Sequence, residues 1–543
     1  MGDLHSKLLQ TRREIYLRLK ETAVSYDIQH SAELENYYKA QEAYEKKKFD
    51  VVSSEEFLKS VDRSQIIYLG DFHTFDQSSK NFKRLIKFLL QQNKELIIGL
   101  EMVSSSQQQK INSFIKGQIT DKEFLEDINY KESWRFPWVH YSELFSIAKE
   151  KNISIFGLNS EGSLEKRDDH AATIISKVIN KHKEAQFLIL FGELHILPDK
   201  LPGKVRSKIN GKFEDLIVHQ NLDSIYWKQL ETSPDGRIGS SIVRLEKNEF
   251  SLQNSPPWIK LESYIYWFEN LMDDPDFDLH EYSIENSIKL FNENVYDNFC
   301  YLASKICDSL GLKIDTDLLN EFNLYDHQSL EYVLKETLKH PNKDFYQKLI
   351  KNNQFFHIVD TDIYYCPSYS INRITYIVGC HIFHSITKRA KQVVAHDTKA
   401  NQFYYWVNQF SFSYFCTKIL NPYRKCSLVA DIRNDYEQTI SDQSTSIGNE
   451  NVLAITLDTF DQTISDEFVE EHNYFELHES AKLIGNCLGD FIYSHYHDIG
   501  KSCIDIKLKS AADISLSRPN LHCLIEEIKR ISPNFFTKSK KMF

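Results

Sequence analysis

The sequence predicts an α/β fold in which a mostly parallel sheet is flanked by helices. We expect an N-terminal helical segment before this sheet and a larger, mainly helical C-terminal region after it. From about residue 51 to 220, short β-rich apolar runs alternate with polar helical stretches, the pattern of repeated βαβ units. The chain also has 543 residues, which is too many for one domain of roughly 100–200 residues.

The N-terminal segment, residues 1–50, is expected to form two helices. Residues 7–24 carry apolar side chains near helical spacing, which predicts an amphipathic helix. Residues 31–49 are charged and rich in tyrosine, which favours a second, solvated helix.

Four apolar runs predict buried strands. They are QIIYLGDFH (65–73), ELIIGLEM (95–102), ISIFGLNSEG (153–162) and FLILFGELH (187–195). Each run contains a glycine that is followed within three residues by polar or ionisable groups. The interval from Gly70 to Gly99 suits one βαβ unit, which takes about 30 residues. The interval from Gly99 to Gly157 is longer and leaves room for an excursion, the aromatic stretch ESWRFPWVHY (132–141).

A helix is expected after the first of these strands. Thr74 and Gln77 match a capping box, T-x-x-Q. An apolar stripe that includes Phe82, Leu85 and Leu89 follows.

A domain boundary is expected at Ser255-Pro256-Pro257-Trp258, because two consecutive prolines end regular structure. This divides the chain into an α/β domain over 51–255 and a C-terminal region over 260–543. Segments 283–311 and 328–352 of that region have helical patterns. Its aromatic stretch FYYWVNQFSFSYF (403–415) is expected to be core.

Composition excludes several classes of protein. The net charge of −12 gives no overall attraction to nucleic acid. No apolar run reaches the length of a transmembrane helix, about 18 residues, and the N-terminus shows no signal peptide or lipobox. The nine cysteines, all at or after Cys300, form no CxxC pair. We therefore expect reduced thiols and a cytoplasmic location.

Polar or ionisable residues follow the four predicted strands where those strands end. In a parallel sheet these ends share one edge, so the side chains are expected to meet in one crevice. The residues concerned are Asp71, His73, Glu101, Asn159, Glu161, Glu193 and His195. Two histidines and several carboxylates in one crevice can ligate a metal or transfer protons.

Two of the four runs share the pattern G-x-x-H, as GDFH and GELH. In each, an acid at the second position and a histidine at the fourth are expected to enter the crevice. A single G-x-x-H is a weak signal, and a lone histidine is more often structural. Two such segments after buried strands favour a functional site.

Together, GDFHTFDQ, GLEM with Gln107-Gln108, FGLN and FGELH resemble the ChaN-like family, which is grouped with Tiki proteases, TraB proteins and erythromycin-esterase-like enzymes. The resemblance covers about residues 60–220. It implies an α/β fold and a pocket lined by His73, His195 and Glu101. The segment EKRDDHAATII (165–175) is similar to the family's Arg-Asp element and gives Arg167 and Asp168.

Several side chains have two readings. Arg167 is either an anion clamp for a propionate, carboxylate or oxyanion, or a surface ion pair with Asp168 or Glu165. His140 and Tyr141 either form the wall of a planar ligand's site or pack on the sheet. His170 is expected to be a surface residue on a helix. The C-terminal segment GCHIFH (379–384) carries two histidines at i, i+3, for which packing is favoured over a metal site.

Two functions remain open. In the first, the chain binds haem or iron, with His73 or His195 as ligand. In the second, it is a hydrolase acting on a peptide or ester, in which His73, His195 and Glu101 hold Mn, Co or Zn; a metal-free variant uses His73 as base, oriented by a carboxylate such as Glu101.

A degenerate domain acting as a scaffold is a third reading. Asp71, Asn159 and Glu193 are expected to contact the cofactor, and His73, Glu101 and Arg167 to be catalytic if the chain is an enzyme. The expected partner is a small molecule or peptide rather than nucleic acid, and a homodimer is a further possibility.

Overall fold

The computed structural model describes most of the chain. The described residues are 2–26, 32–92, 94–209, 211–233, 238–270, 295–314, 316–359, 361–367, 369–389, 398–441, 447–495 and 518–539. The chain forms two compact units. The first, the α/β unit, covers Ile15–Ser283, and the second, the helical unit, covers Met1–Glu14 and Ile284–Lys541.

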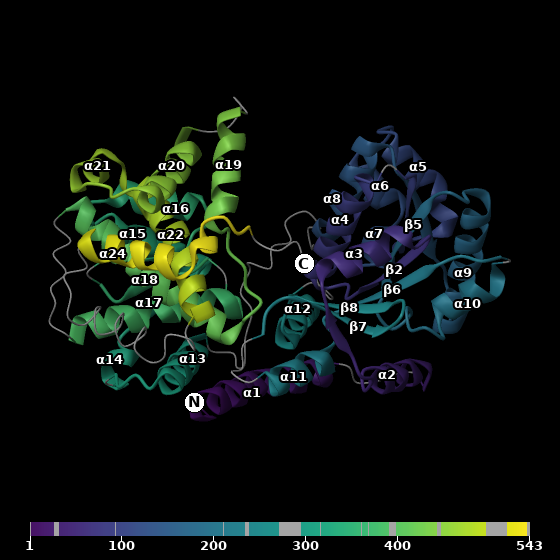
Figure 1. Cartoon of the computed structure of the whole chain (residues 1–543), viewed down its shortest axis with the longest axis horizontal. Coiled ribbons are helices and arrows are strands. Elements are labelled where there is room, and N and C mark those ends of the chain that lie inside the picture. The colour runs from purple at the N-terminus through teal and green to yellow at the C-terminus, as the bar shows by residue number, and fades with distance from the viewer. Residues whose placement is uncertain are drawn as a thin grey trace. The chain divides into compact units, whose positions relative to one another are not determined.

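The α/β unit is built on one sheet of eight strands in the order β1-β7-β8-β6-β2-β5-β3-β4 (Figure 1). The strands are β1 (Asp50–Val52), β2 (Ile66–Asp71), β3 (Leu96–Ser104), β4 (Ser154–Asn159), β5 (Gln186–Gly192), β6 (Asp215–Gln220), β7 (Ser241–Glu246) and β8 (Glu249–Gln253). From β8 to β4 every neighbouring pair is parallel, and β7 pairs antiparallel with β1 and β8. The predicted mostly parallel sheet is confirmed.

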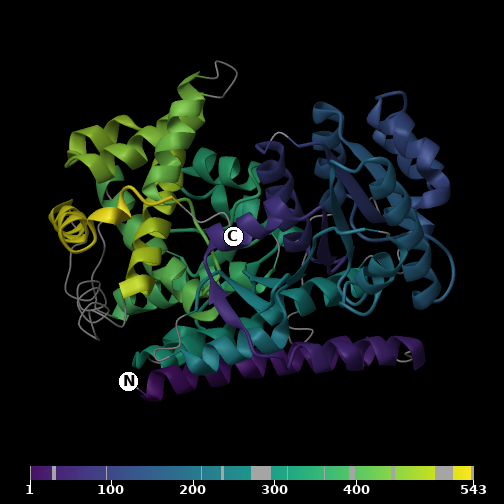
Figure 2. The same ribbon diagram turned by 45° about the vertical axis from the view of Figure 1, so that its right-hand side comes forward.

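The helices of this unit connect and cover the strands, and Figure 2 shows the strands lying between them from a second direction. They are α2 (Ala32–Tyr44), α3 (Ser54–Arg63), α4 (Asp76–Leu90), α5 (Gln108–Ile115), α6 (Asp121–Asp127), α7 (Tyr130–Ser133), α8 (Val139–Lys151), α9 (Leu164–Lys181), α10 (Leu201–Lys208), α11 (Asp223–Thr232), α12 (Pro257–Asn270) and the later part of α1 (Gly2–Tyr26). Both helices expected in residues 1–50 are therefore present.

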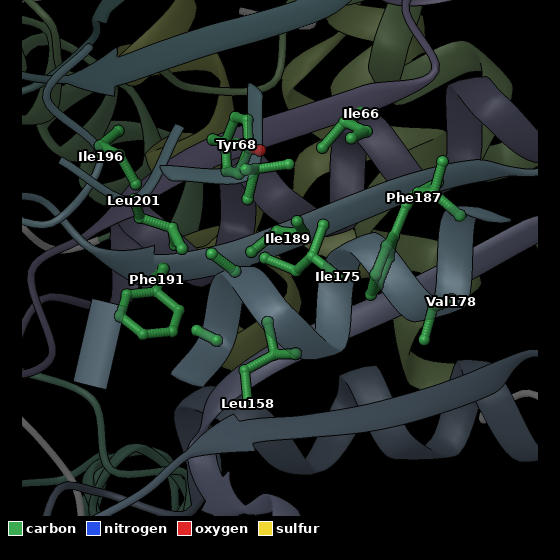
Figure 3. Packing of buried hydrophobic residues seen from close by; sticks show 14 of the residues in the cluster. Ile66, Tyr68, Leu158, Ile175, Val178, Phe187, Ile189, Phe191, Ile196 and Leu201 are labelled. Atoms are coloured by element: carbon green, nitrogen blue, oxygen red, sulfur yellow. The ribbon is translucent and has the colours of Figure 1, made fainter. Parts of the chain in front are cut away.

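The core on one face of the sheet shows why the apolar runs form strands. Ile66 and Tyr68 of β2 and Phe187, Ile189 and Phe191 of β5 point to the same side, because side chains two apart in a strand share a face. Ile175 and Val178 of α9 pack against them (Figure 3). Since β2 and β5 are buried on both faces, their sequences are continuously apolar rather than alternating.

The capping box expected at Thr74 and Gln77 is wrong. Helix α4 begins at Asp76, and its N-cap residue, Phe75, makes no side-chain cap. The Thr74 hydroxyl instead lies 3.1 Å from the Ser263 hydroxyl of α12. The Thr74 hydroxyl thus contacts a buried side chain of another helix and does not cap α4.

The bounds of the α/β unit extend beyond the expected boundary at Pro256-Pro257. Pro257 begins α12, which belongs to the same compact unit as the sheet. Proline is well tolerated in the first turn of a helix, where its missing N–H is not needed. Independent folding of residues 51–255 and 260–543 stays a prediction.

The helical unit centres on α18 (Lys399–Leu420), which is buried along almost its whole length. Around it are α13 (Val295–Leu310), α14 (Thr316–Asn320), α15 (Leu330–Thr337), α16 (Lys343–Lys351), α17 (Ile371–Arg389), α19 (Val429–Ser441), α20 (Ile447–Asp461), α21 (Asp466–Glu471), α22 (Tyr474–His495) and α24 (Arg518–Ile531), with a small sheet of β9 (Asn323–Tyr325), β10 (Phe356–His357) and β11 (Ile363–Tyr365). The predicted aromatic core segment is therefore confirmed. Of the helix expected over 283–311, residues 283–294 lie outside the described part.

Close approach of α18 to its neighbours depends on glycine. A Cβ added at Gly379 of α17 would lie 2.6 Å from Ser413 Cα, and one added at Gly489 of α22 would lie 2.5 Å from the Ser411 carbonyl oxygen. Both contacts involve backbone that cannot move aside. Across the described residues, no helix has the length and apolar character that a membrane crossing needs.

Candidate functional site

The ends of β2, β3 and β5 bring the predicted site residues together. In the register of the parallel pair, Asp71 of β2 lies opposite Gly192 of β5. His73 and His195 follow these strand ends, and Glu101 lies in β3 on the other side of β5. A Cβ built on Gly192 would lie 3.2 Å from Glu101 Oε2, 3.3 Å from His195 Cδ2 and 3.5 Å from His73 Nε2. The three side chains therefore converge on one point above Gly192.

Glu101 occupies an irregular part of β3. Leu100 pairs with Gly157 and Ser104 with Asn159, so β3 carries extra residues between these two points. A Cβ on Gly157 would lie 2.8 Å from the carbonyl oxygens of Val103 and Ser104. The glycine thus gives the bulged backbone room, and the bulge lets the buried Glu101 carboxylate accept a hydrogen bond from Gly192 N at 2.6 Å.

Both histidines point their Nε2 atoms at this carboxylate. His73 Nε2 lies 3.9 Å from Glu101 Oε2, and His195 Nε2 lies 4.0 Å from Glu101 Oε1. The side chain of His73 is 22% exposed, whereas that of His195 is 7% exposed. His73 is therefore the more accessible of the two imidazoles.

Each histidine is held through its other ring nitrogen by an aspartate, and each aspartate by a tyrosine. His73 Nδ1 donates to Asp71 at 2.9 Å, and Tyr141 Oη donates to the same carboxylate at 2.9 Å. His195 Nδ1 donates to Asp168 at 2.5 Å, and Tyr37 Oη donates to Asp168 at 2.7 Å. Because an ionised carboxylate only accepts, the hydrogen of each ring lies on Nδ1 and Nε2 is the available nitrogen.

Charge at the site is balanced around Glu101. Burial alone disfavours its ionised form, but charge interactions with His195, His73 and Arg167 and the hydrogen bond from Gly192 N lower the pKa of Glu101. For His73, burial alone lowers the pKa, but the hydrogen bond and charge of Asp71, with the charge of Glu101, outweigh burial and raise it. Glu101 is thus an anion, and His73 takes up a proton more readily than a free histidine.

Arg167 and Asn159 belong to the same cluster. Arg167 Nη2 donates to Glu101 Oε1, and its Nε donates to Asn159 Oδ1 at 3.1 Å. Neither Asp168 nor Glu165 is its partner, since Asp168 holds His195. Arg167 therefore pairs with the buried Glu101 carboxylate and not with an acid at the surface.

The expectation for Glu193 is wrong. Its carboxylate accepts a hydrogen bond from His219 Nδ1 and lies against Gly70, where a Cβ would be 1.8 Å from Glu193 Oε2. Gly70 and Asp71 are consecutive residues of β2 and point to opposite faces. The acids of the two G-x-x-H segments therefore lie on opposite faces, and Glu161, also expected at this edge, is exposed.

The aromatic excursion between β3 and β4 packs against His73. The ring of Trp134 lies 4.5 Å from the His73 ring and that of Phe136 lies 4.9 Å from it. Phe136 in turn stacks on Trp267 of α12 at 4.8 Å. Sequence reasoning located this stretch but chose His140 and Tyr141 as its contact residues; the length of the Gly99–Gly157 interval was the only signal for Trp134 and Phe136.

The remaining predicted histidines have structural partners. His140 Nδ1 donates to the His73 carbonyl oxygen at 3.3 Å, and burial lowers the pKa of His140. His170 is half-buried and lies 2.7 Å from the Ser105 hydroxyl. In the helical unit, His381 Nε2 donates to the Leu319 carbonyl oxygen at 2.9 Å, so packing is the better reading of GCHIFH.

No group of three or more His, Cys, Asp or Glu side chains among the described residues has the spacing of a metal centre. Two ligands of a tetrahedral Zn²⁺ at 2.0–2.2 Å lie about 3.4 Å apart. The two distances between histidine and Glu101, 3.9 and 4.0 Å, are wider than this. The cluster would have to contract to hold an ion, and Arg167 already neutralises one Glu101 oxygen.

Comparisons with known proteins agree with the motifs. Residues 57–167 match the model of a family described as haem-binding uptake, Tiki superfamily, ChaN. A solved structure described as cofacial heme binding to ChaN of Campylobacter jejuni has 15% sequence identity, covers 37% of this chain and 92% of that chain, and superposes with a TM-score of 0.26. No curated protein matches. The segment that contains His73, Glu101 and Arg167 thus matches the ChaN family, and the resemblance expected from the motifs is confirmed.

Proposed function

We propose that the α/β unit binds haem and that His73 is the residue facing the iron. One observation carries this. Within the segment that matches the haem-binding family, His73 has a partly exposed imidazole flanked by Trp134 and Phe136. Aromatic and apolar side chains around a positioned ligand atom are typical of cofactor sites.

The environment of His73 suits axial ligation. Metal-bound histidines usually donate their second ring N–H to a carboxylate or carbonyl, which fixes the tautomer and raises ligand basicity. Asp71 does this at Nδ1, and Tyr141 holds Asp71 in turn. When bound, haem would supply an iron centre whose reactivity depends on its axial ligand.

Arg167 supports the binding of an acidic group. Its Nε and Nη2 are used by Asn159 and Glu101, while its Nη1 makes no hydrogen bond within the described part of the chain. Its side chain is 21% exposed, so Nη1 is available to a propionate carboxylate. Asp71 and Asn159 then act on the ligand indirectly, by orienting His73 and Arg167.

A second candidate is a metal-dependent hydrolase acting on a peptide or ester. The observation that favours it is the convergence of His73 Nε2 and His195 Nε2 on the two oxygens of Glu101. Mn²⁺, Co²⁺ or Zn²⁺ held there would activate water. In the metal-free variant the carboxylate orienting His73 is Asp71, not Glu101. A homodimer and a cytoplasmic location stay predictions.

The test is a haemin titration of the purified chain, followed by its visible absorption band. We expect His73→Ala to weaken binding by well over tenfold, since losing even an indirect ligand partner costs about 10–100-fold. His182→Ala is the matched control, because His182 is a half-buried histidine of the same unit that pairs with Glu95 away from the site.

The same variants separate the two candidates. If haem affinity falls in His73→Ala and holds in His182→Ala, haem binding at His73 is supported. If the wild-type chain gives no haem band and instead retains a stoichiometric divalent metal that both His73→Ala and His195→Ala lose, the hydrolase is supported. Unchanged haem affinity in His73→Ala contradicts the proposed ligand.

A further inference from the structure

Two cysteines that are far apart in the sequence come together in the helical unit. Cys426 lies in the connection between α18 and α19, and Cys487 lies in α22. Cys426 Sγ donates to the Asn486 carbonyl oxygen at 3.6 Å. In the opposite direction, Cys487 Sγ donates to the Ser427 carbonyl oxygen at 3.1 Å. Each sulfur therefore binds the residue next to the other cysteine in the sequence, and both cysteines are free thiols.

The two thiols also contact each other. A hydrogen bond with the Cys426 sulfur raises the pKa of the Cys487 thiol, and burial raises it further. Such a bond requires adjacent sulfur atoms, so the contact agrees with the crossed bonds to the backbone. Two cysteines form a disulfide only where their side chains already approach each other, because distant ones would need backbone movement. Cys426 and Cys487 satisfy this condition in the folded chain.

The backbone that carries this pair is held in place by Lys418. The ammonium group of Lys418 donates to the carbonyl oxygens of Pro422 and Arg424, at 3.1 and 2.9 Å. It also pairs with Asp490 of α22 at 3.1 Å. Lys418 therefore ties the connection that carries one cysteine to the helix that carries the other. Groups held together in this way react as if at high concentration, because little freedom of motion is left to lose.

We propose that Cys426 and Cys487 form a reversible disulfide, which cross-links the α18–α19 connection to α22 when the chain meets a low-molecular-weight disulfide. The redox state of the surroundings then sets how firmly this connection is attached to the rest of the helical unit. The proposal concerns the helical unit alone and is independent of the haem site, whose residues all belong to the α/β unit.

The exchange takes two steps, and the more accessible thiol reacts first. Cys426 is half-buried, whereas Cys487 is fully buried. The Cys426 thiolate attacks one sulfur of oxidised glutathione, forms a mixed disulfide and releases one reduced glutathione. Cys487 then gives up its proton and attacks the Cys426 sulfur, which releases the second reduced glutathione. The two protein thiols have lost two electrons and two protons, and the oxidant has gained both.

The test is incubation of the folded full chain with increasing ratios of oxidised to reduced glutathione, followed by peptide mapping. We expect the map to show Cys426 linked to Cys487, and excess dithiothreitol to remove the link. Formation of the link should also raise the thermal midpoint by several degrees, because it closes a long loop in the unfolded chain. A wild-type chain that stays unlinked here even in fully oxidised glutathione, or that links other cysteines instead, would overturn the proposal.

Serine variants separate the roles of the two thiols. Cys487→Ser should stop at the mixed disulfide and retain a glutathione adduct on Cys426. Cys426→Ser should leave Cys487 unmodified, because its sulfur is buried. Cys300→Ser is the matched control, since Cys300 is also half-buried but its sulfur binds Asn320 Oδ1, and the link should form in it as in the wild type. The map of the wild-type chain decides the matter even if a serine variant does not fold.

Discussion

In the first G-x-x-H segment the acid, Asp71, holds the histidine of its own segment, whereas in the second the acid, Glu193, binds His219 on the other face of the sheet. Asp168 from α9 takes the corresponding place beside His195. In each half of the site a tyrosine binds an aspartate, and that aspartate binds a histidine. The two aspartates nevertheless come from different positions relative to the G-x-x-H motifs. Equivalent chemistry at two strand ends does not require equivalent positions in the sequence.

The two glycines that open these segments should differ most in their response to substitution. In Gly70→Ala the new Cβ would lie 1.8 Å from Glu193 Oε2 and 2.6 Å from its Cδ, so the half-buried carboxylate must move away from His219. We expect a loss of about 3 kcal/mol in the free energy of unfolding, the upper range for overpacking. Urea denaturation followed by circular dichroism measures it.

Gly192→Ala is the matched control for Gly70→Ala. Its nearest contact, 3.2 Å to Glu101 Oε2, can relax by a few tenths of an ångström, so stability should fall by less than about 1 kcal/mol. The added methyl group lies among Glu101, His73 and His195, however, and haem affinity should fall at least tenfold. Equal destabilisation by the two substitutions would contradict the different placing of the two acids.

Removing the two acids should separate stability from binding. In Glu193→Ala the buried His219 loses the partner of its Nδ1, and its Nε2 has no hydrogen-bond partner among the described residues. An unsatisfied buried group costs about 1–3 kcal/mol, so we expect about 2 kcal/mol less stability with haem affinity unchanged. Asp71→Ala should instead weaken haem binding, because His73 loses its orientation. Weakened haem binding in Glu193→Ala would show that this carboxylate does act on the site.

The strands of this site were predictable because their sequences satisfy burial on both faces. All four apolar runs became β2, β3, β4 and β5, with strand ends within three residues of those expected. Strands β1, β6, β7 and β8 were not predicted. Strands β1 and β7 include exposed or half-buried positions, whereas β6 is buried throughout and its short run DLIVHQ was missed.

The convergence of His73, Glu101 and His195 followed from the shared edge of a parallel sheet. The partners of these residues did not, because they depend on tertiary contacts. Asp168 binds His195, and Tyr37 binds Asp168, from helices whose packing no local pattern specifies. The face chosen by Glu193 depends on the space left by Gly70 in a neighbouring strand.

The pH dependence of stability should report the Asp71 half of the site. The pKa of His73 is raised in the folded state, so its contribution is complete below the unfolded value of about 6.5 and is lost as pH rises through the folded value. The pKa of Glu101 is lowered, so its contribution is complete above about 4.3 and is lost as pH falls through the folded value. Together they favour the folded chain most between these limits.

Asp71→Asn isolates the histidine part of this curve. The amide keeps a hydrogen bond but removes the charge that raises the pKa of His73, so the loss of stability above about pH 6.5 should shrink. The acid side, which depends on Glu101, should persist. The denaturation midpoints of ligand-free Asp71→Asn and of the unchanged chain are compared between these pH limits and above the upper one. If the loss of stability at high pH is the same in both, His73 does not titrate with Asp71.

The two tyrosines test whether the halves of the site are equivalent. Tyr141→Phe removes one of the hydrogen bonds to Asp71, and Tyr37→Phe removes one of those to Asp168. Each loses a single bond to a charged acceptor, so we expect about 1.5 kcal/mol of stability from each. Asp168 is fully buried and Asp71 nearly so, which leaves little water to replace either hydroxyl. Both series of tyrosine, aspartate and histidine meet at Glu101, so the two losses of stability should be coupled. The loss in the double variant should therefore differ from the sum of the two single losses by more than the roughly 0.5 kcal/mol within which distant sites add. Strict additivity in urea denaturation would show that the two halves are alike in design but energetically separate.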